Sequence, residues 1–166
     1  MITKKRIGWA LLIIIIAMQF FRPNLNVANS TVNDISKLYP VPDSVKAIIK
    51  TSCNDCHSNY TVYPWYVNIQ PVGWWLTNHI NDGKKHFNFS EFAAYPIYRQ
   101  YDKLGDVIEL IDKDEMPLSS YTFIHRDAIL NAGERTLLID WAKMLKDNMK
   151  STYPADSLIK PKDRKK

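Results

Sequence analysis

The sequence has few cysteines, no strand-like pattern and no surplus of positive charge in its middle part. Only two of its 166 residues are cysteines, and both lie well after the N-terminal apolar run. A lipoprotein anchor, which needs a cysteine directly after that run, is therefore excluded. No segment repeats, and no stretch alternates polar with apolar residues as half-buried strands do. We therefore expect one all-α domain, since 46% apolar residues suffice for a core at this length.

The excess of positive charge lies at the two ends of the chain. The formal net charge is +5, yet residues 30–150 contain 13 lysines and arginines against 15 aspartates and glutamates. A basic surface that binds nucleic acid is therefore not expected. The basic residues of 151–166 are most simply a solvated, disordered tail, and binding to an acidic partner or to lipid headgroups is the alternative.

The N-terminal segment, residues 1–22, has the features of an export signal. A basic cluster at residues 4–6 precedes an apolar run at residues 7–21. The length of the run lies between that of a signal core and that of a spanning helix. Cleavage is the alternative outcome, but Ala28 lacks a second small residue that would make a good cleavage site. We expect an uncleaved signal anchor, a transmembrane segment that leaves the rest of the chain on the periplasmic side of the inner membrane.

The remaining chain divides into a linker and a domain. Residues 23–41 are polar and aperiodic, which predicts a tether, and residues 42–150 contain the amphipathic segments. Helices are predicted to begin near Pro42, Pro71, Pro96 and Asn131. The first has both cysteines on its apolar face, the second ends at Gly83, and the last opens with a capping box. The segment 112–124 is predicted to be a loop.

The sequence Cys53-Asn54-Asp55-Cys56-His57 is a Cys-x-x-Cys-His motif, which is typical of covalent haem attachment. Two thiols three residues apart can each bond one vinyl group on the same porphyrin edge, and the adjacent histidine becomes the proximal iron ligand. The alternatives are a redox dithiol, a disulfide, and a zinc site that uses the cysteines with His57, His79 or His86. An exported chain with both cysteines in this motif favours one haem c.

The sixth iron ligand is predicted from residue type and context. Met116 precedes Pro117 in a segment without helical periodicity, so its thioether could lie over the distal face of the haem. His79 is the alternative ligand, because we place it on the apolar face of the second helix. An open sixth position is the third option. The other methionines and histidines fit core packing or exposed loops better, and these are Met144, Met149, His86 and His125.

With these residues in place, the chain resembles the haem-binding domain family of small bacterial c-type cytochromes, common in Bacteroidota. The matching blocks span about residues 40 to 147, and they are Cys-Asn-Asp-Cys-His-Ser-Asn at 53–59, Tyr-Pro-Trp-Tyr at 63–66, His79 followed by Gly83, Asn-Phe-Ser-Glu at 88–91, Met-Pro-Leu at 116–118 and Leu-Ile-Asp-Trp-Ala at 138–142. The resemblance implies a cytochrome c-like helical fold with haem c on Cys53, Cys56 and His57, and it supports Met116 as a ligand. One departure is Phe92, where the family tends to have Trp.

Several aromatic residues follow the motif, and we expect them to wall the haem pocket. They are Tyr63, Trp65, Tyr66, Trp74 and Trp75. An electron relay through these rings is the alternative. Asp55, inside the motif, is expected to be merely exposed.

These features predict an electron carrier and not an enzyme. Ligation by His57 and Met116 would close both iron positions to substrates. The expected partners are redox proteins, such as a membrane respiratory complex or a periplasmic reductase. A peroxidase-like enzyme or gas sensor with an open or gated sixth position is the alternative, and His79 is then the candidate distal acid or base.

Overall fold

The computed structural model describes residues 3–163, and within that range the chain is all-α, as predicted. Its seven α-helices are α1 (Lys4–Met18), α2 (Asp43–Ser52), α3 (Asn54–His57), α4 (Val72–His86), α5 (Ile97–Asp112), α6 (Ser119–Thr122) and α7 (Ala132–Thr152). Short 3-10 turns occupy Ile35–Lys37, Trp65–Asn68, Phe89–Ala94, Arg126–Ala128, Ala155–Leu158 and Pro161–Asp163. The described residues contain no β-strand, only one isolated antiparallel β-bridge between Val27 and Tyr60.

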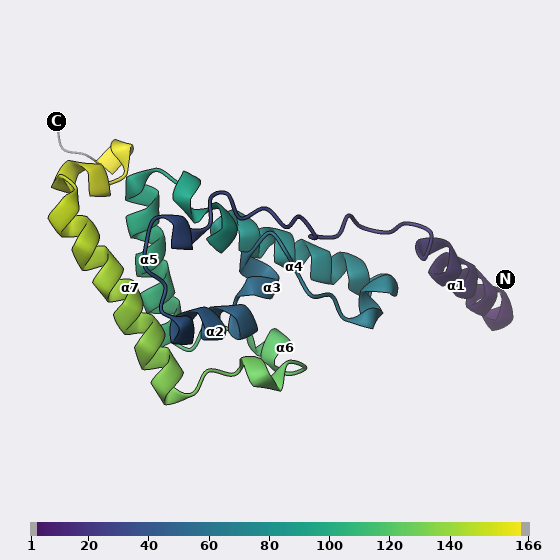
Figure 1. The fold of residues 1–166 in the computed structure, drawn as a ribbon. Coiled ribbons are helices and arrows are strands. Elements are labelled where there is room, and N and C mark those ends of the chain that lie inside the picture. The colour runs from purple at the N-terminus through teal and green to yellow at the C-terminus, as the bar shows by residue number, and fades with distance from the viewer. Residues whose placement is uncertain (1–2, 164–166) are drawn as a thin grey trace.

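Helices α5 and α7 pack along each other and form the main part of the core (Figure 1). Leu104 of α5 and Leu138 and Leu145 of α7 are almost completely buried between them. The predicted capping box is confirmed at the start of α7, where Asn131 accepts a bond from the Glu134 amide and Glu134 accepts one from the Asn131 amide. This long helix packs against α5 and α2.

Helices α2, α3 and α4 hold the Cys-x-x-Cys-His motif. Val45, Ile48 and Ile49 bury one face of α2 in the core, and α2 also contacts α7. The chain bends at Cys53, and the short helix α3 then packs against α4. Contrary to our prediction, α4 does not end at Gly83 but continues to His86. The prediction treated the glycine as a helix terminator, whereas it has a packing role described below.

The segment 23–41, which we predicted to be a tether, packs on the domain instead. Ile35 and Tyr39 are buried in the core. Asn26 is also buried, and its side-chain amide donates to the Ser58 carbonyl and to the Thr61 hydroxyl, both at 2.9 Å. The lack of periodicity in this segment indicates irregular backbone, and irregular backbone can still bury side chains when its polar groups find partners.

The residues that follow 150 are also more ordered than the tail that we expected. Helix α7 runs to Thr152, and the turn at Ala155–Leu158 packs against α5. The Lys160 ammonium lies 3.0 Å from the Asp102 carboxylate. Residues 164–166 of the predicted tail lie outside the described range.

The predicted transmembrane segment forms helix α1, which projects beyond the end of the molecule at which α4 begins (Figure 1). It contains 15 residues, and none of them is buried. Among residues 3–163, no helix combines the length and the apolar character needed to cross a membrane. The predicted transmembrane helix is therefore not found in this part of the chain.

Candidate functional site

A single cavity of about 400 Å³ collects the residues that the sequence analysis singled out. Cys53, Cys56, His57 and Met116 all line it, and the cavity size is within the usual range for small-molecule and cofactor sites. Its walls are mostly apolar, and they include Ile49, Phe87, Phe89, Val107, Leu110, Leu130, Leu138 and Trp141. The cavity therefore suits a large, flat, apolar group with a few polar contacts.

The motif lies at the junction between α2 and α3. The Cys53 amide donates to the Ile49 carbonyl at 3.0 Å, and the His57 amide donates to the Cys53 carbonyl at 2.9 Å. Cys53 thus ends one helix and begins the next, which places Cys53, Cys56 and His57 along one wall. Both cysteines are free thiols.

The environment of the thiols keeps them protonated. Burial, with a smaller contribution from Cys56, raises the pKa of Cys53 to about 12. Burial and the neighbouring Asp55 carboxylate raise the pKa of Cys56 to about 11. Because thiolates are the species that attack disulfides, these high pKa values disfavour the dithiol alternative. Among the described residues, no group of three or more His, Cys, Asp or Glu side chains is arranged to hold a metal ion, which disfavours the zinc alternative.

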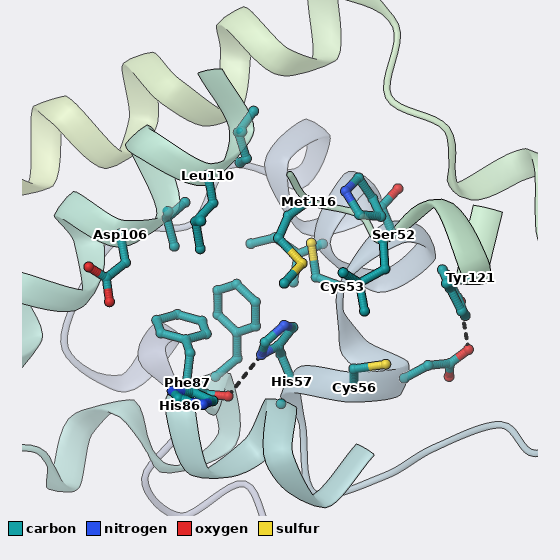
Figure 2. A pocket seen from close by; sticks show the side chains of 18 of the residues that line it. Ser52, Cys53, Cys56, His57, His86, Phe87, Asp106, Leu110, Met116 and Tyr121 are labelled. Atoms are coloured by element: carbon teal, nitrogen blue, oxygen red, sulfur yellow. Dashed lines mark hydrogen bonds between the residues drawn. The ribbon is translucent and has the colours of Figure 1, made fainter. Parts of the chain in front are cut away.

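His57 is held in an orientation suited to metal ligation. Its Nδ1 lies 3.0 Å from the Phe87 carbonyl oxygen, so this nitrogen donates in the neutral tautomer and Nε2 keeps its lone pair. Burial is the main cause of a lowered pKa for His57, which keeps the imidazole neutral. Figure 2 shows the ring pointing into the cavity.

Met116 enters the cavity from the segment that follows α5. The amides of Glu115 and Met116 both donate to the Leu110 carbonyl, at 2.9 and 3.2 Å, and Asp114 adopts a positive φ of 60°. These features turn the chain back over the cavity. In Figure 2 the Met116 thioether and the His57 ring point into the same space from different parts of the chain.

The other two methionines that we considered as iron ligands do not line this cavity. Met149 is buried in the core and Met144 is exposed on α7. His79 does line the cavity. Contrary to our prediction, its side chain is exposed and does not lie on the buried face of α4. The buried face consists of Gly73, Thr77 and Ile80.

The orientation of α4 explains the exposure of His79. The positions of Gly73 and Gly83 place one face of α4 against the Val67 and Cys56 carbonyls, and Val72 and Trp75 then face outward. The His79 ring lies 4.4 Å from the Trp75 ring. Of the remaining histidines, His86 is exposed at the cavity rim, as predicted, while His125 is half-buried and stacks on Tyr121.

Gly83 is a site residue that the sequence analysis misread. A Cβ atom at this position would lie 2.8 Å from the Cys56 carbonyl oxygen. The absence of a side chain therefore allows α4 to approach α3 directly beneath the motif. Gly83 and Cys56 lie far apart in the sequence, so no local sequence pattern predicts this contact.

Asp55 is a second misread residue, because it is half-buried and hydrogen-bonded. One carboxylate oxygen accepts a bond from the Tyr121 hydroxyl at 2.8 Å, and the other accepts one from the Val62 amide at 3.0 Å. Burial, followed by Asp55, raises the pKa of Tyr121 above its ordinary range. Asp55 thus connects the motif to the helix that follows Met116.

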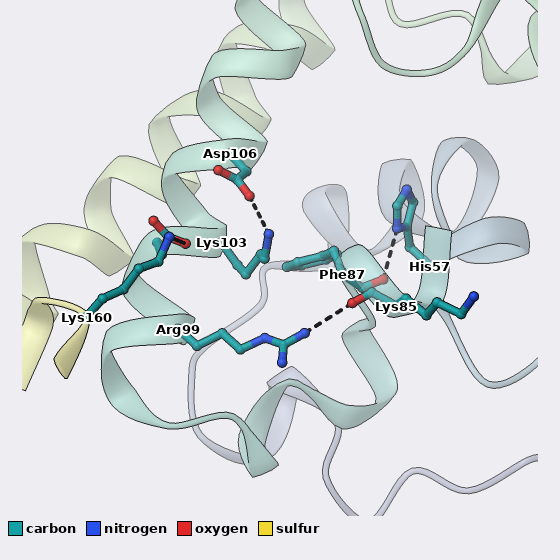
Figure 3. A network of polar contacts seen from close by, with 8 residues as sticks. His57, Lys85, Phe87, Arg99, Lys103, Asp106 and Lys160 are labelled. Atoms are coloured by element: carbon teal, nitrogen blue, oxygen red, sulfur yellow. Dashed lines mark hydrogen bonds and ion pairs between the residues drawn. The ribbon is translucent and has the colours of Figure 1, made fainter. Parts of the chain in front are cut away.

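Charged residues occupy one rim of the cavity (Figure 3). Lys103 and Asp106 of α5 form an ion pair at 2.6 Å, and both line the cavity. On the side away from the cavity, Arg99 donates to the Lys85 carbonyl at 3.1 Å. This rim offers an ammonium group to any acidic substituent of a bound group.

The aromatic residues that we expected around the pocket lie elsewhere. None of Tyr63, Trp65, Tyr66, Trp74 and Trp75 is among the residues that line the cavity. Trp65 and Trp75 are exposed. The Tyr63 hydroxyl accepts a hydrogen bond from the Asn26 amide, and the Trp74 indole donates one to the Phe21 carbonyl, so both rings contact the N-terminal segment. Phe92, the departure from the family pattern, packs in the core between Tyr39 and Phe87.

The donor set fits haem c, because two thiols and a neutral imidazole line one wall of an apolar cavity and a thioether enters the same cavity. A family model described as "Haem-binding domain" matches residues 13–144. Neither a curated protein nor a solved structure matches the chain. From the site and the family match together, the chain belongs to the haem-binding domain family.

Proposed function

We propose that this protein is a monohaem c-type cytochrome that carries electrons. The observation that supports this proposal is the presence of a histidine and a methionine in the same cavity as both cysteines of the motif. Two protein ligands leave iron with no position for a substrate, which favours electron transfer over catalysis.

Each residue of the cavity has a distinct role in this proposal. Cys53 and Cys56 would hold the haem through thioether bonds, and His57 would ligate the iron through Nε2. Met116 would supply the second iron ligand, and its loop is fixed by the two bonds to the Leu110 carbonyl. The bound haem supplies an iron that alternates between the ferric and ferrous states, and a thioether ligand favours the ferrous state.

The surrounding side chains control access to this centre. The apolar walls exclude water, and the bond from His57 Nδ1 to the Phe87 carbonyl fixes the ring plane. The proposed partners are redox proteins on the periplasmic side of the inner membrane, such as a respiratory complex or a reductase. The basic start and apolar run at residues 4–21 support export, and an attached carrier would meet membrane partners at high effective concentration.

Visible absorption spectra test the proposal. The full chain is produced in a host with cytochrome c maturation machinery, and oxidised and reduced spectra are compared for wild type, Met116→Ala and Met144→Ala. Wild type should be low-spin, with the weak long-wavelength band of methionine-to-iron charge transfer. Met116→Ala should lose this band. Met144→Ala should keep it, because Met144 lies on the exposed side of α7.

Two results would redirect the assignment. A high-spin wild type that binds cyanide or carbon monoxide rapidly would favour a haem enzyme or sensor. A Met116→Ala spectrum identical to that of wild type would move the search for the sixth ligand to His79, which also lines the cavity.

A further inference from the structure

The end of helix α1 is bonded to the haem-binding domain. Gln19 donates to the Gln70 carbonyl at 3.1 Å and accepts from the Gln70 amide at 2.9 Å. The Trp74 indole donates to the Phe21 carbonyl at 2.7 Å, and Arg22 donates to the Asn68 side chain at 2.7 Å. These four bonds fix the base of α1 against the segment that leads into α4.

Large apolar side chains that neighbour this joint in the sequence are exposed. They form what we call the apolar collar, which consists of Phe20, Phe21, Trp65, Ile69, Val72 and Trp75. Phe20 and Phe21 are 81% and 69% exposed, and Trp65 and Trp75 are 77% and 51% exposed. Exposed apolar patches of this kind mark surfaces that contact a partner or a membrane.

The collar lies in a region in which Arg22 is the one formally charged residue. Residues 56–81 contain no Asp, Glu, Lys or Arg, and residues 7–33 contain only Arg22. A protein surface in contact with water normally has charged residues at much closer intervals. This region is continuous with α1, whose apolar side chains are exposed on all sides.

We propose that the apolar collar rests in the surface of a lipid bilayer and, with α1, fixes the haem-binding domain against the membrane. Lipid is the occupant that suits both parts of this surface, because tryptophan is enriched at membrane interfaces and an all-round apolar helix needs an apolar solvent. Helix α1 reaches ~22 Å at 1.5 Å per residue, which is shorter than the ~30 Å hydrocarbon core, so it would enter the bilayer without crossing it. The collar adds apolar surface at the base of α1.

This arrangement would set the distance of the site from the membrane. Trp75 of the collar contacts His79, and His79 lines the cavity. From Trp75 to Gly83 beneath the motif, α4 rises by ~12 Å. The domain would thus hold its cavity near the membrane surface in a fixed orientation, and would not move on a loose tether.

Thiol labelling of the full chain in vesicles tests the proposal. Trp65→Cys, Trp75→Cys and Phe123→Cys variants are reconstituted into vesicles of phosphatidylethanolamine and phosphatidylglycerol and treated with a membrane-impermeant maleimide. Phe123, which is 71% exposed and directly follows α6, is the matched control. The rate at each site is divided by the rate for the same thiol in the guanidinium-unfolded chain, and adducts are located by peptide mass spectrometry.

The collar thiols should react about tenfold more slowly than the thiol at position 123, because lipid excludes both the reagent and the thiolate form. Equal normalised rates at the three positions would overturn the proposal. Maleimide adducts on the peptide that contains Cys53 and Cys56 would count against thioether attachment of haem, and hence against the proposed function. They would leave the membrane proposal intact, because the collar labelling is measured on different peptides.

Discussion

The Tyr121 hydroxyl donates a hydrogen bond to the Asp55 carboxylate at 2.8 Å. Asp55 lies between the two cysteines of the motif, and Tyr121 belongs to α6, which follows Met116. The bond therefore joins the wall that holds His57 to the segment that supplies Met116 (Figure 2). It ties together the two parts of the chain that would supply the two iron ligands of a bound haem.

Tyr121→Phe should weaken the hold of Met116 on the iron. A hydrogen bond to a charged group contributes about 1.5–3 kcal/mol, so added imidazole should displace Met116 at roughly ten- to a hundredfold lower concentration. The measurement is an imidazole titration followed by loss of the long-wavelength methionine band. Tyr60→Phe, at an exposed tyrosine, is the control and should titrate like wild type. Coincident titrations for wild type and Tyr121→Phe would show that the bond does not support Met116.

Gly83→Ala should destabilise the domain by about 1–3 kcal/mol, because the new methyl group would clash with the Cys56 carbonyl and separate α3 from α4. The free energy of unfolding is measured by denaturant titration. Gly105→Ala is a matched control in α5, where the methyl group would meet only the flexible end of Lys146. This control should be neutral or stabilising by up to about 1 kcal/mol. Equal effects of the two substitutions would contradict the packing role of Gly83.

Glu91 should make stability depend on acidic pH. Hydrogen bonds from the Asn33 and Asn59 side chains hold the pKa of Glu91 below its ordinary value of 4.5. A carboxyl group whose pKa is lower in the folded state than in the unfolded state stabilises the fold at pH values above its unfolded-state pKa. This contribution is lost as the pH falls through the folded-state pKa. The stability difference between wild type and Glu91→Gln should therefore be largest near neutral pH and should shrink below pH 4.5.

Unfolding curves measured between neutral pH and pH 3 check this prediction. Glu115→Gln, at an exposed carboxylate outside this hydrogen-bond cluster, serves as the control. A wild-type advantage over Glu91→Gln that stays constant across this range would refute the assignment.

Asn131→Ala should cost about 1 kcal/mol of stability, because it removes the acceptor for the Glu134 amide at the start of α7. Asn131→Asp keeps an oxygen in that position and should be close to wild type. Thermal unfolding of both variants measures the difference. Equal losses for Ala and Asp would mean that the capping bond does not contribute.

Local pattern was sufficient to predict the parts of the fold that depend on neighbouring residues. The helical face of residues 45–52, the start of α7 at Asn131 and the Cys-x-x-Cys-His motif are determined within a few residues, by helical periodicity, capping chemistry and the spacing of two thiols, whereas the break at Cys53 that divides the predicted first helix is not. The same information identified Met116, and the structure brings it into the cavity with the motif.

Only the tertiary structure decided which faces and segments are buried. The apolar pattern of α4 predicts the wrong face for His79. The face of α4 that packs on the domain is the one with Gly73 and Gly83, and not the one with the large apolar residues. Asp55 gains its role from Tyr121, a residue far away in the sequence, and the polar segment 23–41 packs because Asn26 finds partners near the motif. Contacts between distant residues leave no periodic signal in the sequence, since each depends on where the rest of the chain lies. The sequence alone thus determined which side chains are available for the proposed chemistry of the site, and the packing of glycines and polar side chains decided its shape.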